Sequence, residues 1–492
     1  MSDPLIDSVR QLLDDAASVF ADVEGVDGIT QARARLDEPL RVAIAGKVKA
    51  GKSTLLNALV GEKVAPTDTG ECTRIVTWYQ DGHVFRVMLH PADDIPPIQA
   101  RFHRDDGAIE VDLEGYSPAE VDKLEITWPT RSLAAITLID TPGVDTLSDD
   151  IAGKAQEFLD PKDTETPADA VLYLMKHIHS SDVRLLEAFH DEAVSQPNPV
   201  NAIAILSRAD EIGGGRVDSM ASARRIANRY GNDAGMRRLV QLVLPVAGLL
   251  AESARTLTES EFKALSELAS VPRKDLDKLL LSADRFVRAN AGVPLTDAER
   301  QHLLNRLGVF GIRQSMALLR SRKAKSSVEL ADELVQRSGL VDLQTVLTTL
   351  FVDRATVLKS RSALLAIERL CEQYQRHPGA GDIHARIEQV MAGAHPFNEL
   401  ATLAAIRSGR VKGRREELSD LEQILGASGT ADWQRLGLEP ESNTEQINNA
   451  AMEALGRWQR VAEHPGKTQD LKQVAAVAIR SMEAVVAKTY QG

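Results

Sequence analysis

Hydrophobic and polar positions follow two different patterns along the chain. Short runs of consecutive apolar and β-branched residues, which are typical of buried parallel strands, occur only between about residues 40 and 250. These runs lie at 41–45, 75–79, 84–89, 124–128, 136–139, 170–175, 202–206 and 242–246. From about residue 353 they stop, and apolar residues recur at helical spacing instead. The pattern predicts an α/β domain followed by helices.

Helical patterns also occur before and within the α/β region. Apolar side chains over 5–23 share one helical face, so we expect this helix to end near Gly25 and Gly28 and to pack against C-terminal helices. Residues 253–335 are mostly helical in pattern and predict an insertion that packs on the α/β domain. After residue 353, helices are expected to about 374, then over 383–407, to 425, over 442–463 and over 467–490.

The expected fold is therefore a mostly parallel sheet with helices on both faces, joined to an elongated all-α bundle. We divide the chain into an N-terminal helix that joins the bundle (1–38), an α/β domain with a helical insertion at about 253–335 (39–352), and the bundle itself (353–492). The polar segment 90–121, between two predicted strands, has no clear pattern.

The segment 46–53, GKVKAGKS, matches the phosphate-binding pattern G-x-x-x-x-G-K-S. A predicted strand precedes it and a helical pattern over 54–60 follows it, which is the context that the motif needs and makes a chance match improbable. Lys52 is expected to reach the β- and γ-phosphates, and the Ser53 hydroxyl to ligate Mg²⁺. The residues expected to contact the nucleotide here are Gly46, Lys49, Ala50, Gly51, Lys52, Ser53 and Thr54.

A polar, threonine-rich loop over 64–74 follows the first helix of the α/β domain. In a nucleotide switch protein, a threonine of such a loop reaches Mg²⁺ and the γ-phosphate only in the triphosphate state. Thr73 and Thr69 are both candidates, and we favour Thr73 because it comes just before the strand at 75–79. The alternative for either residue is an ordinary threonine in a solvated loop.

A second motif, D-T-P-G, follows the apolar run at 136–139. Asp140, at the carboxyl end of a predicted strand, is expected to hold Mg²⁺ through water. The Gly143 N–H is expected to contact the γ-phosphate. An aspartate at the end of a strand is common, but its pairing with a phosphate loop earlier in the chain favours the functional interpretation.

The run at 202–206 leads directly into Ser207-Arg208-Ala209-Asp210, where a GTPase has N/T-K-x-D. A carboxylate such as Asp210 can accept two hydrogen bonds from the guanine edge, which adenine does not offer, so GTP is favoured over ATP. Ser207 and Arg208 depart from the pattern, although the planar head of Arg208 can still lie over a base. Gly248, after the last predicted strand, is a weaker candidate for base contact.

Composition and charge restrict the classes of function that the chain can have. With 58 Lys and Arg against 71 Asp and Glu, the formal charge is −13, so general nucleic-acid binding is not expected, although a local basic patch could meet an anionic membrane. Two distant cysteines, Cys72 and Cys371, predict neither a disulfide nor a metal site and favour a reducing cytosol. We expect no signal peptide and, because no apolar stretch approaches about 18 residues, no membrane span.

One turn between predicted helices is rich in cations. Near an anionic leaflet each cation could contribute about 1 kcal/mol, which makes this turn a candidate membrane tip. The alternative is an ordinary solvated turn. The cations are Arg407, Arg410, Lys412, Arg414 and Arg415.

These motifs together resemble the bacterial dynamin-like GTPases, most of all the mycobacterial isoniazid-inducible dynamin-like proteins. The resemblance rests on GKVKAGKSTLLNAL (46–59), ECTR (71–74), LIDTPG (138–143), LSRADEIG (206–213) and RLGVFGI (306–312). It implies a GTPase head on a helical neck and trunk, Mg²⁺-dependent GTP hydrolysis, and self-association through the heads or with a related dynamin-like protein. It also implies peripheral binding at the inner face of the plasma membrane, in membrane remodelling or maintenance and in tolerance to cell-wall drugs.

Two features depart from the relatives. Val48 stands where eukaryotic dynamins have a glutamine that positions the attacking water, so that role falls to Lys49 or to a partner head, and slow basal turnover is expected. The apolar membrane-inserting paddle of some relatives has no counterpart here. Two alternatives therefore stay open: a soluble regulatory GTPase that switches a protein partner, and an assembly scaffold that hydrolyses little GTP.

Overall fold

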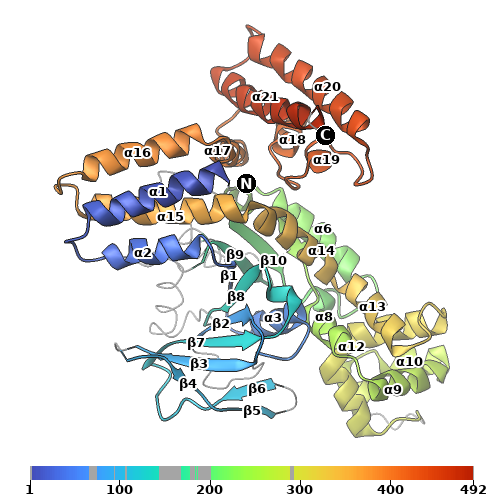
Figure 1. The fold of residues 1–492 in the computed structure, drawn as a ribbon. Helices are drawn as coiled ribbons and strands as arrows, with labels where there is room; N and C mark the ends of the chain where they lie inside the picture. Colours follow the sequence, from blue (N-terminus) through green and yellow to red (C-terminus); the bar gives the residue numbers. More distant parts are fainter. Residues whose placement is uncertain are drawn as a thin grey trace.

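In a computed structural model, the described part of the protein consists of a central β-sheet, a separate β-hairpin and surrounding groups of helices (Figure 1). The structure describes residues 3–65, 75–92, 95–105, 108–142, 168–177, 183, 186, 201–288 and 293–490. In Figure 1, helices from both ends of the chain lie above the sheet, and the insertion helices lie at the lower right. Within the described residues, no helix combines the length and the apolar character needed to cross a membrane.

Among the residues that the structure describes, the sheet has nine strands in the order β11-β10-β9-β1-β8-β2-β7-β3-β4. β1, β8, β9, β10 and β11 run parallel to one another, so their carboxyl ends meet at one edge. β2 pairs antiparallel with β8. The strands are β1 (Leu40–Gly46), β2 (Val76–Asp81), β3 (Arg86–Pro91), β4 (Ile98–Gln99), β7 (Val121–Trp128), β8 (Ile136–Asp140), β9 (Ala170–Met175), β10 (Ala202–Leu206) and β11 (Val243–Pro245). The predicted strands are confirmed, and the unassigned segment holds β4 and a separate hairpin, β5 (Phe102–Asp105) and β6 (Ala108–Val111).

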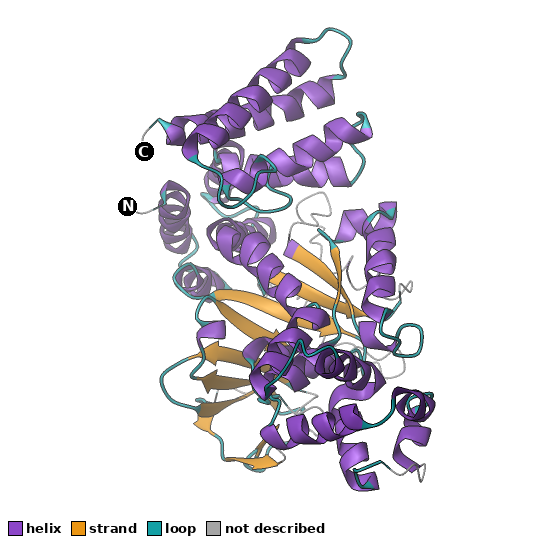
Figure 2. Ribbon diagram, turned by 90° about the vertical axis from the view of Figure 1, so that its right-hand side faces the viewer, coloured by secondary structure: helices purple, strands orange, loops and turns teal. Residues whose placement is uncertain are grey.

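Helices cover both faces of the sheet (Figure 2). Because side chains alternate along a strand, β1 sends Ala43 and Ala45 into one hydrophobic core and Val42 and Ile44 into the other. The predicted doubly covered, mostly parallel sheet is therefore confirmed. Its helices are α3 (Lys52–Val60), α6 (Ser219–Gly231), α7 (Ala234–Leu239), α8 (Gly248–Arg255), α9 (Glu259–Ser270), α10 (Arg273–Leu279), α11 (Ala283–Arg288), α12 (Asp297–Arg320), α13 (Ser327–Ser338) and α14 (Leu340–Val346).

The two ends of the chain share a third hydrophobic core, which we call the inner bundle. It consists of α1 (Pro4–Val19), α2 (Val26–Arg35), α15 (Ala355–Gln373) and α16 (Ala380–Gly393). The first helix packs on C-terminal helices as expected. The sequence pattern missed α2, because Gly25, with φ 93°, precedes a second helix and Gly28 lies inside it.

A fourth core forms the outer bundle, so the described C-terminal helices divide between two hydrophobic cores. Its helices are α17 (His395–Arg407), α18 (Arg415–Ile424), α19 (Asp432–Arg435), α20 (Thr444–Glu463) and α21 (Gln469–Thr489). The predicted helix 383–407 breaks at Ala394, whose backbone is extended, and Pro396 lies in the first turn of α17, a position that favours proline. α17 joins the two bundles, with Phe397 in the inner core and Leu403 in the outer one.

Candidate functional site

The loop between β1 and α3 is folded as its glycines require. A Cβ at Gly46 (φ 148°) would lie 2.5 Å from the Leu174 carbonyl oxygen, a distance that no side chain tolerates. Gly51 (φ 98°) and Lys49 (φ 60°) both adopt left-handed backbone conformations. The chain therefore turns back on itself before α3, whose N-terminus favours an anion.

Two side chains of the loop face the end of β8. Lys52 Nζ donates to the Gly46 carbonyl oxygen at 3.4 Å, and Ser53 Oγ donates to Asp140 Oδ2 at 3.0 Å. The pairing of β1 with β8, which sets Ile44 beside Asp140, brings these motifs together. Burial raises the pKa of Asp140 and lowers the pKa of Lys52, while their mutual attraction opposes both shifts.

The Ser53–Asp140 pair fits a magnesium ion. Asp140 Oδ1 is buried and has no hydrogen-bond partner among the described residues, so this oxygen is available as a ligand. Carboxylate, hydroxyl and phosphate oxygens are the ligands that Mg²⁺ prefers. The other predicted ligand, Thr73, and the predicted γ-phosphate contact, Gly143, lie outside the described residues.

Sequence reasoning assigned no role to Thr141, yet it fixes the turn after β8. Its N–H and its Oγ1 both donate to the Ile44 carbonyl oxygen, at 3.3 and 3.0 Å, and the residue is buried. The hydroxyl thus holds the Asp140 turn against β1. Its place in the D-T-P-G motif was the signal that could have revealed this role.

A cavity of about 200 Å³ lies beside the phosphate loop. It brings together predicted residues from three separate segments: Ala50, Gly51, Thr54, Ser207, Arg208, Asp210 and Gly248. Sequence reasoning missed its remaining walls, which are Leu55, Leu174, Ile205, Glu211, Val246 and Leu249. Most of these are apolar residues at strand or helix ends, whose patterns indicated burial but not a ligand.

Asp210 lies in a 3₁₀ turn (Ala209–Glu211) at one side of this cavity and is only 8% exposed. Burial raises its pKa, a hydrogen bond from its own backbone N–H and the nearby Arg208 lower it, and Glu211 raises it. Arg208 has a left-handed backbone (φ 51°), and its guanidinium donates to Glu211 at 2.8 Å and to the Lys49 carbonyl at 2.9 Å. The carboxylate and the phosphate loop therefore border the same cavity.

A buried amide supports the start of the threonine-rich loop. Asn57 Oδ1 accepts hydrogen bonds from the backbone N–H groups of Val64 and Ala65, at 2.9 and 2.8 Å. Its Nδ2 donates to Glu252 on α8 at 2.9 Å. The start of the predicted switch loop is therefore anchored, through Asn57, to α8, the helix that begins at Gly248.

The basic turn differs from the prediction at one residue. Arg407 is 11% exposed, donates to the Gln241 carbonyl oxygen, and lies 4.0 Å from Glu422, so it faces the α/β unit and its assignment to a membrane tip is wrong. Arg410, Lys412, Arg414 and Arg415 are exposed. Nearby, Glu417 accepts from Lys467 at 2.6 Å, which places this turn beside the turn between α20 and α21.

Comparison with known proteins agrees with this geometry. The model of the dynamin family matches residues 42–186. The isoniazid-induced protein IniC of Mycobacterium tuberculosis is 40% identical over 458 residues, or 92% of this chain and 91% of IniC. IniA of the same organism is 27% identical over 282 residues, 56% of this chain and 41% of IniA. A match to a solved structure of an oligomerised bacterial dynamin pair spans 99% of this chain and 75% of the chain in that structure, at 14% sequence identity. Its TM-score is 0.29, which is too low for a comparison of individual helices and strands.

Proposed function

The chain belongs to the dynamin family, as a bacterial dynamin-like protein close to the isoniazid-induced proteins, and we propose that it binds GTP with Mg²⁺ and hydrolyses it. The observation that carries this proposal is the Ser53–Asp140 contact beside a cavity that Asp210 borders. Phosphates, metal and base are then recognised by three motifs that the sheet brings to one edge.

The phosphate end of the proposed site lies between β1, α3 and the end of β8. Backbone N–H groups of the loop from Gly46 to Thr54 bind the phosphates. Lys52 supplies a positive charge, and the bound phosphates in turn favour the charged form of this buried amine. Ser53 and Asp140, with Thr73, would hold Mg²⁺, which neutralises charge on the phosphate oxygens. Gly143 completes the γ-phosphate contacts.

The base end of the cavity supports the proposed preference for guanine. Asp210 accepts hydrogen bonds from the guanine N1–H and N2–H₂ groups, and Arg208, Ser207 and Gly248 line the remaining space. A buried carboxylate that finds two donors regains the solvation that it lost on folding, so guanine binds better than adenine.

Hydrolysis needs a group that positions water, and Val48 offers none. Its side chain is 47% exposed and apolar. We assign the role to Lys49 or to a residue of a second GTPase domain, and turnover of the isolated monomer is expected to be slow. The same observation favours a second candidate function, a nucleotide-gated assembly scaffold that hydrolyses little GTP.

We further propose that the nucleotide cycle is coupled to peripheral binding of anionic lipid at the inner face of the plasma membrane, and to its remodelling or maintenance. The exposed cations Arg410, Lys412, Arg414 and Arg415 support a lipid contact. Family membership supports self-association through the GTPase domains or pairing with a related dynamin-like protein. The identity to an isoniazid-induced protein supports a role in tolerance to cell-wall drugs.

Two assays on the full chain test this function. GTP turnover with Mg²⁺ should be measurable, and Lys52→Ala should lose at least about tenfold in nucleotide affinity, because a charge-assisted contact to phosphate is lost. Unchanged binding in that variant would overturn the site assignment. Tight binding without turnover, even at high protein concentration, would favour the scaffold.

Co-sedimentation with phosphatidylglycerol-containing vesicles, with and without GTP, tests the membrane role. Binding that exceeds binding to pure phosphatidylcholine and changes with GTP is the expected result. Absence of binding in both nucleotide states would favour the soluble regulatory GTPase.

A further inference from the structure

α12, in the helical insertion, is broken at Gly308, and the break lies against the base cavity. Gly308 has φ 60° and ψ 176°, a conformation that is essentially restricted to glycine. A Cβ built there would lie 3.7 Å from Leu249 Cδ2 and 4.0 Å from Asp210 Oδ2. The break in the helix therefore lies beside the carboxylate assigned to guanine.

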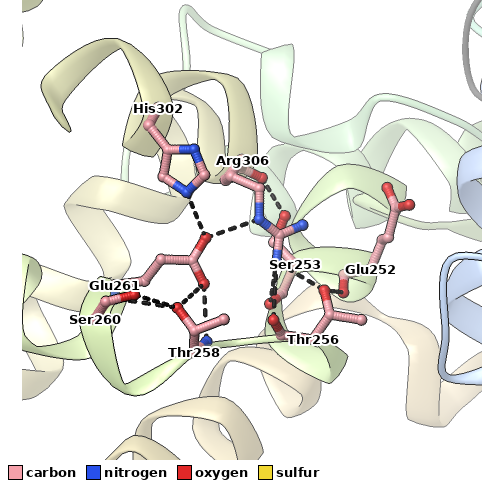
Figure 3. A network of polar contacts seen from close by, with 8 residues as sticks. All are labelled: Glu252, Ser253, Thr256, Thr258, Ser260, Glu261, His302 and Arg306. Carbon is pink, nitrogen blue, oxygen red and sulfur yellow. Dashed lines mark hydrogen bonds and ion pairs between the residues drawn. The ribbon is translucent and has the colours of Figure 1, made fainter. Parts of the chain in front are cut away.

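On the N-terminal side of the break, Arg306 anchors α12 to α8 and α9 (Figure 3). Its Nε donates to Glu261 at 2.8 Å, and its Nη2 donates to the carbonyl oxygen and hydroxyl of Thr256 at 3.1 and 2.7 Å. Ser253 donates back to the Arg306 carbonyl oxygen. Because α8 begins at Gly248, this network fixes the first half of α12 to one wall of the cavity.

On the C-terminal side, Arg313 holds the loop that follows Asp210. Its Nη1 donates to the carbonyl oxygens of Gly214 and Gly215 at 3.3 and 2.8 Å, and its Nη2 donates to Leu280 at 2.7 Å. The next residue, Gln314, donates to the Val217 carbonyl at 2.9 Å. The loop therefore lies directly against the second half of α12.

The loop needs this support because of its composition. Three consecutive glycines, Gly213, Gly214 and Gly215, all have left-handed φ values, of 68°, 75° and 67°. Glycine loses more conformational freedom on folding than any other residue, so such a segment has little stiffness of its own. A carboxylate that must meet two guanine donors at once has to be held in one orientation.

We propose that α12 positions Asp210 for guanine, with Gly308 and Arg313 as positioning residues that set the preference for guanine over other purines. Arg313 fixes the glycine loop, Arg306 fixes the helix, and the bend at Gly308 lets α12 pass beside the carboxylate without a side chain between them. The proposal rests on the proposed function, because it assumes that guanine occupies the Asp210 cavity.

The test compares the affinities of GDP and inosine diphosphate by calorimetry, since inosine lacks the 2-amino group. In the native protein, one hydrogen bond to a charged acceptor predicts about a tenfold or larger preference for GDP. Arg313→Ala should reduce this ratio toward one. The matched control is Arg320→Ala on the same helix, whose guanidinium also donates to carbonyl oxygens, those of Ala269 and Val271 at 3.1 and 2.6 Å, and which should keep the native ratio.

Two further variants separate the possible failures. Asp210→Ala should abolish the GDP preference; if it does not, the guanine assignment itself is wrong. If Asp210→Ala abolishes it while Arg313→Ala and Gly308→Ala keep the native ratio, only the role of α12 is refuted. Arg313→Lys, which retains the charge but not the forked donor, should give an intermediate ratio, and a native ratio in a folded Lys variant also counts against the proposal.

Discussion

Arg208 Nη2 donates to the Lys49 carbonyl oxygen at 2.9 Å and so joins the base loop to the phosphate loop. The same guanidinium contacts Glu211. Arg208 is one of the residues that depart from the usual N/T-K-x-D pattern, yet it spans the distance between the two loops. The two loops of the candidate site are therefore connected despite this departure.

Removing this connection should weaken nucleotide binding. Arg208→Ala loses a hydrogen bond worth about 0.5–1.5 kcal/mol, which predicts a roughly 2- to 12-fold higher Kd for GDP. Arg208→Lys should keep most of the affinity, because one ammonium can still reach the Lys49 carbonyl. Arg216→Ala, which removes an exposed arginine paired with Asp218, is the control. Equal affinities in all three variants would contradict the role of Arg208.

The magnesium assignment predicts a change in metal dependence. Asp140→Asn preserves the shape of the side chain but removes its charge, so added Mg²⁺ should strengthen GTP binding far less than in the native protein. Ser53→Ala should have a similar effect. Titrations of GTP with Mg²⁺ and with a chelator measure it; a full Mg²⁺ response in both variants would exclude these ligands.

The outer bundle should lose stability in acid because of Glu399. Burial alone would raise its pKa, but hydrogen bonds from His395, Arg435 and Ser481 lower the pKa from 4.5 to about 2, with Arg354 also facing this carboxylate. A lowered pKa in the folded state stabilises above pH 4.5 by about 3 kcal/mol, and this is lost as the pH falls toward 2. Glu399→Gln should flatten this acid limb in denaturant unfolding curves, whereas an unchanged limb would contradict the assignment.

Two glycine substitutions should act in opposite directions. Gly46→Ala places a Cβ 2.5 Å from the Leu174 carbonyl oxygen and should both destabilise the fold and reduce GDP affinity. Gly456→Ala, inside α20 with only the end of Arg460 nearby at 3.7 Å, should raise the free energy of unfolding by about 0.5–1 kcal/mol. Thermal unfolding with and without GDP checks both; a native Gly46→Ala variant would show that the loop has another conformation.

The exposed turn between α17 and α18 makes a prediction about lipid. Reversing the charge of Lys412, Arg414 and Arg415 should reduce binding to phosphatidylglycerol vesicles, with each cation worth about 1 kcal/mol at an anionic surface. The control reverses three exposed cations of α10, Arg273, Lys274 and Lys278, and so changes the net charge equally. Equal losses in both variants would indicate a general charge effect instead of a membrane contact.

The geometry of the candidate site was largely predictable because the information that sets it is local in the sequence. Gly46, Lys52 and Asp140 lie in short motifs whose geometry follows from a strand, a turn and a helix. The contacts of Arg313 were not predictable. Its partners, the carbonyl oxygens of Gly214, Gly215 and Leu280, are distant in sequence, and any residue could supply a backbone carbonyl. The segment RLGVFGI (306–312), which resembles the dynamin-like relatives, was the available signal for the role of α12. Helical periodicity alone does not predict the break at Gly308.

The misplaced elements have the same explanation. Arg407 looked like part of a charged turn, and only the fold brings Gln241 and Glu422 to it. Gly28 suggested the end of a helix, although packing against α1 and α15 outweighs the low helix propensity of glycine. The pattern of apolar and polar residues and the turn residues predict where helices and strands lie. Which faces of these elements pack together depends on residues that are distant in the sequence.

The inner bundle has a consequence for synthesis on the ribosome. Tyr374 donates to the Glu24 carbonyl, a contact between residues 350 apart in sequence, and α1 shares its core with α15 and α16. At about 5–20 residues per second, the first helix waits roughly 20 to 70 seconds for its partners to be translated. Until then only α2 of the inner bundle is available to cover its apolar stripe, so the nascent chain carries an aggregation-prone surface until α15 and α16 have been made.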